Sequence, residues 1–208
     1  MVLKLALFDF DGTLVDSLRD YHLIETQVIA SLGGRVPDLQ RFRRIIGEDK
    51  DWELFYRRFG IVDKEKSPEH IKKGTIGISH GVISGVKETL EELANRNVGL
   101  SIVSLNPHIN KIILRLDGQL GDHFYRDNIY GASLNKVDAL RRVCRRHEIF
   151  PREAVYIGDM AKDIRETKRA GLVSVGIAND FSYNHKDMLE SANPDYLFDD
   201  IREVTKLF

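Results

Sequence analysis

The chain has 208 residues, of which 42% are hydrophobic and 30% are charged, so it is long enough to bury a full core and too apolar to be a disordered protein. Its 31 Lys and Arg residues nearly balance its 32 Asp and Glu residues, and the net charge of -1 provides no field that would attract nucleic acid or an anionic membrane. A lone cysteine, Cys144, excludes an intramolecular disulfide, and no apolar run approaches the ~20 residues that span a bilayer, so we expect a cytoplasmic protein.

The first expected element is a buried strand over Leu3–Phe10, which runs into the sequence DFDGT. From about Ser17 to His80 no strand-like run follows, and apolar residues instead recur at helical spacing. This spacing is shown by Tyr21, Ile24, Val28 and Leu32, then by Phe42, Ile45 and Ile46, and then by Trp52, Phe55, Tyr56 and Phe59. We therefore expect residues 17–81 to form an inserted, all-helical cap domain.

Strands and helices alternate again from Gly85 onward. Short apolar runs that are typical of buried parallel strands occur at Val98–Ser104, Ala154–Gly158, Val173–Ile177 and Asp195–Phe198. Helical stripes between them are formed by Val86, Leu90 and Leu93, and by Val137, Leu140, Val143 and Cys144. This order predicts an α/β fold with a doubly wound, Rossmann-like parallel sheet, formed by residues 1–16 and 82–208. In such sheets ligands bind outside the carboxyl ends of the strands.

Pairs of carboxylates follow two of the expected strands. Asp9 and Asp11 are separated by one residue, and their mutual repulsion is relieved only by a cation or by one of them taking a proton. A turn with a helix cap is the simpler explanation for an Asp-Gly pair taken alone. Asp159 and Asp163 are one helical turn apart, so both carboxylates face the same side if a helix starts after Gly158. Helix capping explains one of these two carboxylates, but not both.

Two further polar residues fall near strand ends. Ser104 ends its strand, and Lys136 starts a helical stripe. In isolation each has a simpler structural explanation, which is a helix N-cap for Ser104 and a surface position for Lys136. Taken together, DFDGT, Ser104, Lys136 and GDMAKD resemble, in their order and placement, the four-motif signature of the haloacid dehalogenase superfamily. The resemblance covers about Val2–Leu14 and Gly85–Gly176, and the helical insertion is similar in place and character to the caps of phosphoglycolate-phosphatase-like members.

The resemblance implies phosphoryl transfer, because the branches that cleave carbon–halogen or phosphonate bonds lack a second aspartate at the position of Asp11, whereas phosphatases and phosphomutases have it. It implies that Asp9 is the nucleophile that forms an aspartyl phosphate and that Asp11 is the general acid and base. It also implies Mg²⁺, held by Asp9, the backbone carbonyl of Asp11, and Asp159, with Asp163 as a further ligand or an orienting group. The phosphoryl oxygens of a small-molecule phosphate ester would contact Gly12, Thr13, Ser104 and Lys136.

Two positions depart from the pattern of the superfamily. Relatives often carry Asn directly after the second-motif Ser or Thr, whereas here Leu105 follows Ser104 and Asn106 comes next. The contact of that Asn is therefore lost or comes from one residue later. Val137 follows Lys136 at a position where close relatives carry proline. Neither departure touches the core chemistry.

Three other functions remain open. A phosphomutase uses the same motifs and passes the phosphoryl group back to a sugar instead of to water. A non-catalytic module can share the fold, although the retention of all five ionisable motif residues argues against it. A nucleotide-binding oxidoreductase would carry G-x-G-x-x-G after the first strand, and this pattern is absent.

Overall fold

The structure is a computed structural model and describes residues 2–46, 52–61, 81–106, 109–116, 118–120, 123–124, 129–131 and 135–208. The chain divides into two compact units, one formed by Met1–Asp16 with His80–Phe208 and the other by Ser17–Ser79. The side chain of Trp52 and residues 47–51 and 62–80 of the expected cap lie outside the described part of the chain. That the second unit acts as a cap stays a prediction.

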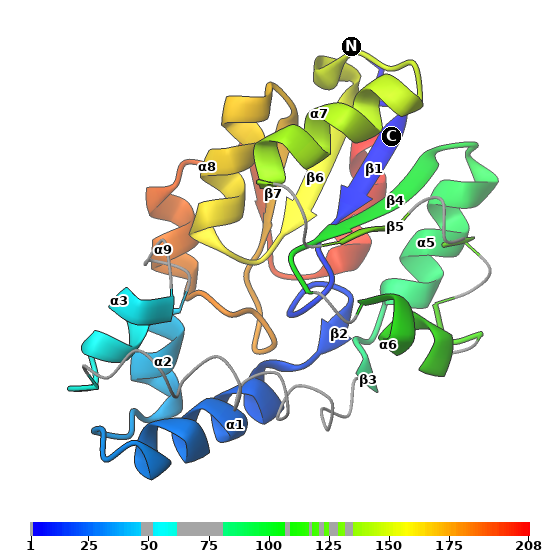
Figure 1. Ribbon diagram of the computed structural model, residues 1–208. Coiled ribbons are helices and arrows are strands. Elements are labelled where there is room, and N and C mark those ends of the chain that lie inside the picture. Colours follow the sequence, from blue (N-terminus) through cyan, green and yellow to red (C-terminus); the bar gives the residue numbers. More distant parts are fainter. Residues whose placement is uncertain are drawn as a thin grey trace. The chain divides into compact units, whose positions relative to one another are not determined.

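The first unit is built on a six-stranded parallel sheet with the strand order β5-β4-β1-β6-β7-β8 (Figure 1). Its strands are β1 (Leu5–Phe8), β4 (Gly99–Ser104), β5 (Ile129–Gly131), β6 (Ala154–Gly158), β7 (Val173–Ile177) and β8 (Tyr196–Phe198). In the centre, Phe8 of β1 pairs with Ile102 of β4 on one side and with Ile157 of β6 on the other. The predicted Rossmann-like α/β fold is confirmed.

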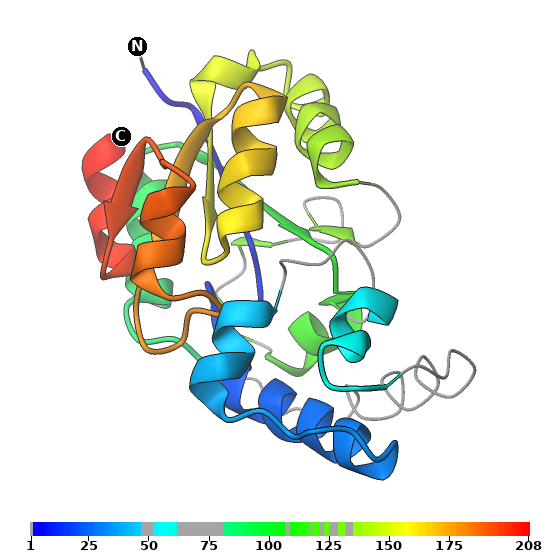
Figure 2. The ribbon, with the colours of Figure 1, turned by 90° about the vertical axis from the view of Figure 1, so that its left-hand side faces the viewer.

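Helices cover both faces of this sheet (Figures 1 and 2). They are α5 (Val86–Asn95), α6 (Ile109–Arg115), α7 (Lys136–Arg146), α8 (Ala161–Ala170), α9 (Lys186–Ser191) and the 3-10 helices η4 (Pro151–Glu153) and η5 (Ile201–Leu207). Successive strand residues point to opposite faces. Leu5 of β1 therefore shares a core cluster with Val143 of α7. Phe8 shares the cluster on the other face with Leu90 of α5. Burial on both faces explains why these strands are almost wholly apolar.

The strand β5 was not predicted from the sequence. It is a short edge strand that pairs only with β4, so Ile129–Gly131 carries too few apolar residues to stand out. The expected first strand, Leu3–Phe10, is too long at both ends, because the ladder covers only Leu5–Phe8. Asp9 nevertheless continues the strand direction, since its backbone amide donates to the Ile157 carbonyl at 2.8 Å.

A two-stranded antiparallel ribbon joins the two ends of the insertion. Strand β2 (Val15–Asp16) pairs with β3 (Gly81–Val82), and Val15 lies opposite Val82. The ribbon therefore holds the points where the chain leaves the first unit and returns to it next to each other. A second unit can be inserted there without a break in the parallel sheet.

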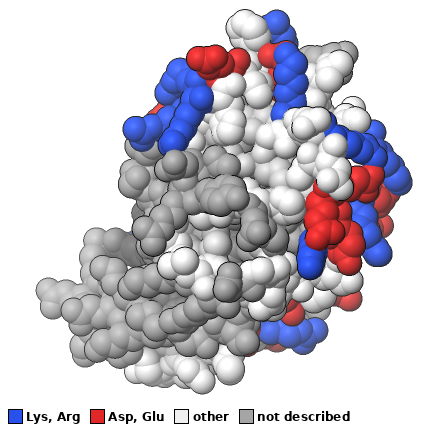
Figure 3. All heavy atoms as spheres, turned by 90° about the vertical axis from the view of Figure 1, so that its right-hand side faces the viewer, with Lys and Arg blue, Asp and Glu red and all other residues white. Residues whose placement is uncertain are grey.

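The surface that Figure 3 shows carries basic and acidic side chains side by side. In α5 an exposed pair joins Lys87 to Glu91, and at the end of this helix Arg96 contacts Glu92. Exposed pairs of this kind contribute little to stability individually. Within the described part of the chain, no helix has both the length and the hydropathy needed to cross a bilayer.

The second unit contains the helices α1 (Leu18–Ser31), α2 (Leu39–Ile45) and α3 (Trp52–Arg57). Asp38 caps α2, because its side chain accepts a hydrogen bond from the Arg41 backbone amide at 2.8 Å. Aromatic rings pack edge to face in the interior, where the Phe55 centroid lies 6.1 Å from that of Phe42 and 5.2 Å from that of Phe59. Apart from Trp52, whose side chain is not described, the apolar residues expected on α2 and α3 are thus buried in the core of this unit.

A buried carboxyl group also lies in the second unit. Of the apolar stripe expected on α1, only Val28 is buried. The buried face of this helix also carries the carboxyl group of Glu25. The Tyr56 hydroxyl donates to Glu25 Oε2 at 2.7 Å, whereas Oε1 is buried with no hydrogen-bond partner among the described residues. Burial raises the pKa of Glu25 to about 7, although the hydrogen bond from Tyr56 opposes the shift.

We expect Glu25→Gln to remove a pH dependence from the stability of the protein. Ionisation of Glu25 disfavours the folded state. The stabilising free energy of protonated Glu25 is therefore fully present below the unfolded-state pKa of about 4.3, and it is lost as the pH rises to about 7. Between pH 5 and pH 8 the wild type should therefore lose about 2–3 kcal/mol more of its free energy of unfolding than Glu25→Gln does. Urea denaturation at both pH values measures this difference.

Glu91→Gln is the matched control, because Glu91 is exposed. This control should keep the pH dependence of the wild type. The same dependence in Glu25→Gln would contradict the assignment of a raised pKa to Glu25.

Candidate active site

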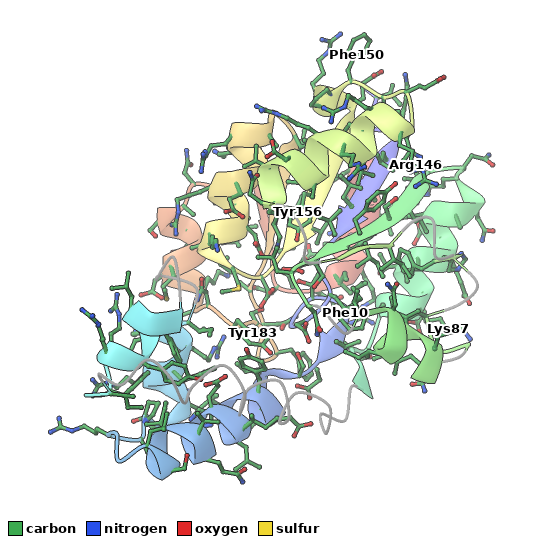
Figure 4. All side chains as sticks on the ribbon, viewed as in Figure 1. Phe10, Lys87, Arg146, Phe150, Tyr156 and Tyr183 are labelled. Carbon is green, nitrogen blue, oxygen red and sulfur yellow. The ribbon has the colours of Figure 1, made fainter. Side chains whose placement is uncertain are left out.

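The carboxyl ends of neighbouring strands bring the predicted polar residues together. Asp9 directly follows β1, Ser104 ends β4, and Asp159 directly follows β6. Because β1 lies between β4 and β6 in a parallel sheet, these three ends lie at one edge of it. Figure 4 shows Phe10 and Tyr183 on the same side of the sheet, beyond the ends of these strands.

Three carboxylates meet at this edge. Asp9, Asp159 and Asp163 each offer one oxygen atom, and these atoms all lie within 4.8 Å of one another. All three residues are buried. Asp163 lies in the first turn of α8, so the spacing of four residues does place it on the same side as Asp159. We call Asp9, Asp159 and Asp163 the carboxylate cluster.

The ammonium group of Lys136 contacts this carboxylate cluster. Lys136 is only 3% exposed, which excludes a surface position. Its Nζ donates to Asp163 Oδ1 at 2.6 Å and to Asp9 Oδ2 at 3.1 Å, and lies 5.0 Å from the centroid of the Tyr156 ring. Burial alone lowers the pKa of Lys136, but the charges of Asp163 and Asp9 outweigh burial and raise the pKa. The ammonium group is therefore held in its charged form.

Asp159 is held by two hydrogen bonds. Its Oδ1 accepts from the Thr13 hydroxyl at 3.1 Å, and its Oδ2 accepts from the Tyr183 backbone amide at 2.6 Å. Gly12 has a φ angle of 75°, and a Cβ atom there would lie 2.3 Å from Asp159 Oδ2 and 2.7 Å from the Tyr183 ring. Only glycine therefore fits this position of the DFDGT turn.

Asp11 is contacted by a residue that follows the neighbouring strand. The Asn106 side chain donates from Nδ2 to Asp11 Oδ2 at 2.9 Å, and its backbone amide donates to Ser104 Oγ at 3.1 Å. Asn106, two residues after Ser104, thus makes a side-chain contact with Asp11, and whether it replaces the contact of the asparagine in relatives stays a prediction. Ser104 is not the N-cap of α6, because this helix begins only at Ile109.

The carboxylate cluster carries more negative charge than Lys136 neutralises. Burial raises the pKa of Asp159 to about 7, which the Tyr183 amide only partly opposes. Burial likewise raises the pKa of Asp163 to about 7, which Lys136 only partly opposes. In addition, Asp163 Oδ2 is buried with no hydrogen-bond partner in the described part of the chain. A bound cation would supply both the missing charge and the missing partner, and carboxylate oxygens are the ligands that hard divalent cations prefer. The cluster therefore fits a divalent metal ion.

The predicted site residues form two groups. In the first group, Lys136 donates to Asp9 and Asp163, Thr13 donates to Asp159, and oxygen atoms of the three carboxylates lie within 4.8 Å of one another. The second group consists of Asp11 and Ser104, which are connected through Asn106. Gly12 allows the close approach of the DFDGT turn to Asp159. The chemical roles that the resemblance implies for these residues stay predictions.

The loop after β7 supports the site, and sequence reasoning did not single it out. Tyr183 donates its amide to Asp159, and the Asn184 side chain accepts a hydrogen bond from the Ala161 amide at 2.9 Å. The second contact provides an acceptor for a backbone amide in the first turn of α8, where amides have no partner within the helix. The same turn carries Asp163. Both contacts join residues far apart in the sequence, so no local spacing predicts them.

Comparisons with known proteins agree with this geometry. The family model of the haloacid dehalogenase-like hydrolases matches residues 6–177. The phosphoglycolate phosphatase of Vibrio cholerae is 30% identical over 96% of this chain and 94% of its own. That of Vibrio parahaemolyticus is 28% identical over 99% of this chain and 96% of its own.

Solved structures share the fold. A predicted phosphoglycolate phosphatase from Haemophilus somnus superimposes with a TM-score of 0.78 at 22% identity, over 99% of this chain and 97% of its own. A conserved haloacid dehalogenase-like protein of unknown function from Agrobacterium tumefaciens superimposes with a TM-score of 0.79 at 20% identity, over 99% of this chain and 97% of its own.

We expect a divalent cation to stabilise the protein through the carboxylate cluster. At a hundredfold excess over its Kd, a cation that binds only the folded state should raise the Tm by roughly 5–10 °C at neutral pH. Asp159→Asn should lose most of this increase, because it removes one of the cluster's charges. Differential scanning fluorimetry with MgCl₂, against NaCl of equal ionic strength, measures the effect.

Asp180→Asn is the matched control, because Asp180 is exposed and lies outside the carboxylate cluster. This control should show the full increase in Tm. An equal increase in Asp159→Asn, or none in the wild type, would exclude the cluster as a cation site.

Proposed function

The chain belongs to the haloacid dehalogenase-like hydrolases and is a phosphatase, and from this premise we propose that it hydrolyses a small-molecule phosphate monoester through an aspartyl phosphate, with Mg²⁺ as its cofactor. One observation carries the proposal. The Asp9 carboxylate lies both beside the buried ammonium group of Lys136 and within a carboxylate cluster that fits a divalent metal ion. Attack by an anionic nucleophile on an anionic phosphate requires such positive charge at the point of attack.

The first step transfers the phosphoryl group to the protein. A carboxylate oxygen of Asp9 attacks phosphorus, and the bond from phosphorus to the ester oxygen breaks. The leaving alkoxide takes a proton from the carboxyl group of Asp11. This step leaves an alcohol, a phosphorylated Asp9 and an ionised Asp11.

The second step restores the protein. A water molecule attacks the same phosphorus atom and gives a proton to the Asp11 carboxylate, while the bond from phosphorus to Asp9 breaks. Inorganic phosphate leaves, and both aspartates return to their starting forms. Asp9 and Asp11, which DFDGT places one residue apart, thus act as nucleophile and as proton carrier.

Two donors are available for the phosphoryl oxygens. An ammonium group has three hydrogens, and the contacts of Lys136 with Asp9 and Asp163 leave the third for a phosphoryl oxygen. The Ser104 hydroxyl oxygen accepts a hydrogen bond from the Asn106 amide, so its own hydrogen can be donated to a second phosphoryl oxygen.

Two further donors proposed from the resemblance are engaged within the protein. The Gly12 amide donates to the Val15 carbonyl at 2.9 Å, and the Thr13 hydroxyl donates to Asp159. Their contacts with the phosphate remain a proposal that requires these bonds to rearrange. In the described geometry, Thr13 orients a carboxylate of the cluster.

We propose that Mg²⁺ binds to the carboxylates of Asp9 and Asp159 and to the backbone carbonyl of Asp11, with Asp163 as a further ligand or as the partner that orients Lys136. When bound, Mg²⁺ offsets the negative charge of the phosphate and polarises a phosphoryl oxygen. A cation at this position is supported by Asp163 Oδ2, which has no hydrogen-bond partner among the described residues, and by the raised pKa values of Asp159 and Asp163.

Phosphoglycolate is the first substrate to test, because the relatives from both Vibrio species are phosphoglycolate phosphatases. We propose that the second unit, Ser17–Ser79, serves as the cap that selects the substrate, and that the reaction takes place in the cytoplasm. A phosphomutase with the same motifs would release little net phosphate and would require a bisphosphate activator. Measurement of released phosphate therefore separates the two functions.

The first test is Asp9→Asn, assayed by phosphate release from phosphoglycolate and an aryl phosphate with Mg²⁺. An amide keeps the shape of the carboxylate but is not a nucleophile, so we expect turnover to fall by at least about 10³-fold. Asp180→Asn should retain the wild-type rate. Residual turnover of more than a few per cent in Asp9→Asn would show that another group attacks phosphorus.

The second test is Asp11→Asn, which separates the covalent route from direct attack by a metal-bound water. An aryl phosphate has a good leaving group and needs little proton donation, whereas hydrolysis of phosphorylated Asp9 still needs its water to be deprotonated. We therefore expect phosphorylated Asp9 to accumulate. Rapid acid quenching should give a burst of aryl alcohol without matching phosphate, and peptide mapping should place the added mass on Asp9. Equal release of both products from the first turnover, with no modified Asp9, would support direct water attack instead.

A further inference from the structure

Asn106 forms a side-chain contact that the proposed chemistry does not yet use. Its Nδ2 lies 2.9 Å from Asp11 Oδ2, and its backbone amide is anchored at 3.1 Å to the Ser104 hydroxyl. Asn106 is only partly buried, and Leu105 between the two anchored residues is 45% exposed. The asparagine is therefore presented to Asp11 by a short segment fixed at the end of β4.

We infer that Asn106 is a positioning residue that holds the Asp11 carboxyl group in the orientation from which it gives and takes protons. The inference rests on the proposed function, because it concerns the role of Asp11 in phosphoryl transfer. It adds a residue from the neighbouring strand to the acid and base machinery, and it gives a function to the displaced asparagine of the sequence SLN.

The orientation of a carboxyl group needs such support. Rotation about the bond between Cβ and Cγ of an aspartate is soft, with a broad two-fold profile. A hydrogen bond at Oδ2 fixes the plane of the Asp11 carboxyl group, and with it the direction of the lone pairs on both oxygens. Proton transfer is efficient only when the donor and acceptor atoms are within hydrogen-bond reach and aligned.

The contact also selects the oxygen that carries the proton. The Asn106 amide nitrogen offers only hydrogens, so a proton on Asp11 Oδ2 would face another hydrogen. In the acid form of Asp11 the proton is therefore directed to Oδ1, while Oδ2 keeps its hydrogen bond. The same contact suits the ionised form, so Asn106 supports Asp11 in both half-reactions without moving.

The dependence of proton transfer on the leaving group distinguishes a positioning role of Asn106 from a purely structural one. For this enzyme kcat/KM reports events up to departure of the leaving group, which needs Asp11 for an alkyl phosphate and hardly at all for an aryl phosphate. Asn106→Leu removes the amide but keeps the backbone bond to Ser104. We expect kcat/KM for phosphoglycolate, or for the best alkyl phosphate found, to fall roughly 10–100-fold, since Asp11 becomes ionised in this step without the hydrogen bond that supports its charge. For an aryl phosphate it should change less than about threefold.

A double-mutant cycle shows whether Asn106 acts through Asp11. In an Asp11→Asn background, addition of Asn106→Leu should lower kcat/KM for the alkyl phosphate by less than about twofold, because the group that it positions is already lost. Asn110→Leu is the matched control for the substitution itself, since Asn110 is exposed on α6, and it should match the wild type.

Three results would overturn the inference: no loss in Asn106→Leu, an equal loss on alkyl and aryl phosphates, or a full additional loss in the Asp11→Asn background. Failure of the proposed function looks different, because the wild type would then not hydrolyse phosphate esters, or Asp9→Asn would remain active. The retained activity of Asn106→Leu on the aryl phosphate also shows that this variant is folded.

Discussion

The burial of three carboxylates around one ammonium group is the constraint on which the site depends. Asp9, Asp159, Asp163 and Lys136 are each at most 7% exposed, so water screens their charges poorly. Lys136 contacts Asp163 and Asp9, whereas Asp159 is held by the neutral donors of Thr13 and Tyr183. Removing charges from water is unfavourable unless each is matched by an opposite charge. The protein therefore folds around a deficit of positive charge that a ligand can fill.

The position of Lys136 shows how this constraint overrides local preferences. A cation is unfavourable at the first residue of a helix, because the amino-terminal end of the helix dipole is itself positive. Asn135 secures this end of α7 by accepting a hydrogen bond from the Asp138 amide at 2.9 Å. The ammonium group lies over the Tyr156 ring, and the Tyr156 hydroxyl donates to the Val103 carbonyl at 3.0 Å. Lys136 is thus fixed against its own helix dipole, which is typical of a functional site.

The sequence predicts the central strands and the cluster well, because buried parallel strands are apolar on both faces and polar residues at their ends are conspicuous. Asp9 and Asp159 follow such strands directly, so the sheet topology alone brings them together. Contacts that depend on the packing of distant loops carry no such pattern. The Tyr183 amide is invisible in a sequence because every residue but proline has one, and Glu25 occupies a buried helix position where a carboxylate is rare. In the sequence, Asn106 is notable only for its position two residues after Ser104. Its contact with Asp11 is evident only in the three-dimensional structure.

The deficit of positive charge also links the binding of cation and phosphate. In the proposed function, the three carboxylates of the cluster outnumber the one ammonium group of Lys136, so a phosphate dianion is expected to bind weakly without a cation. A bound divalent cation reverses this balance at the oxygen atoms that the phosphate approaches. By thermodynamic linkage, the phosphate must then strengthen cation binding by the same factor. In the proposed mechanism the buried carboxylates thus serve two purposes, since they supply the nucleophile and they disfavour phosphate binding until a cation is bound. In the same proposal, the geometry of Asp11, fixed by Asn106, determines where the proton goes once both ligands are present.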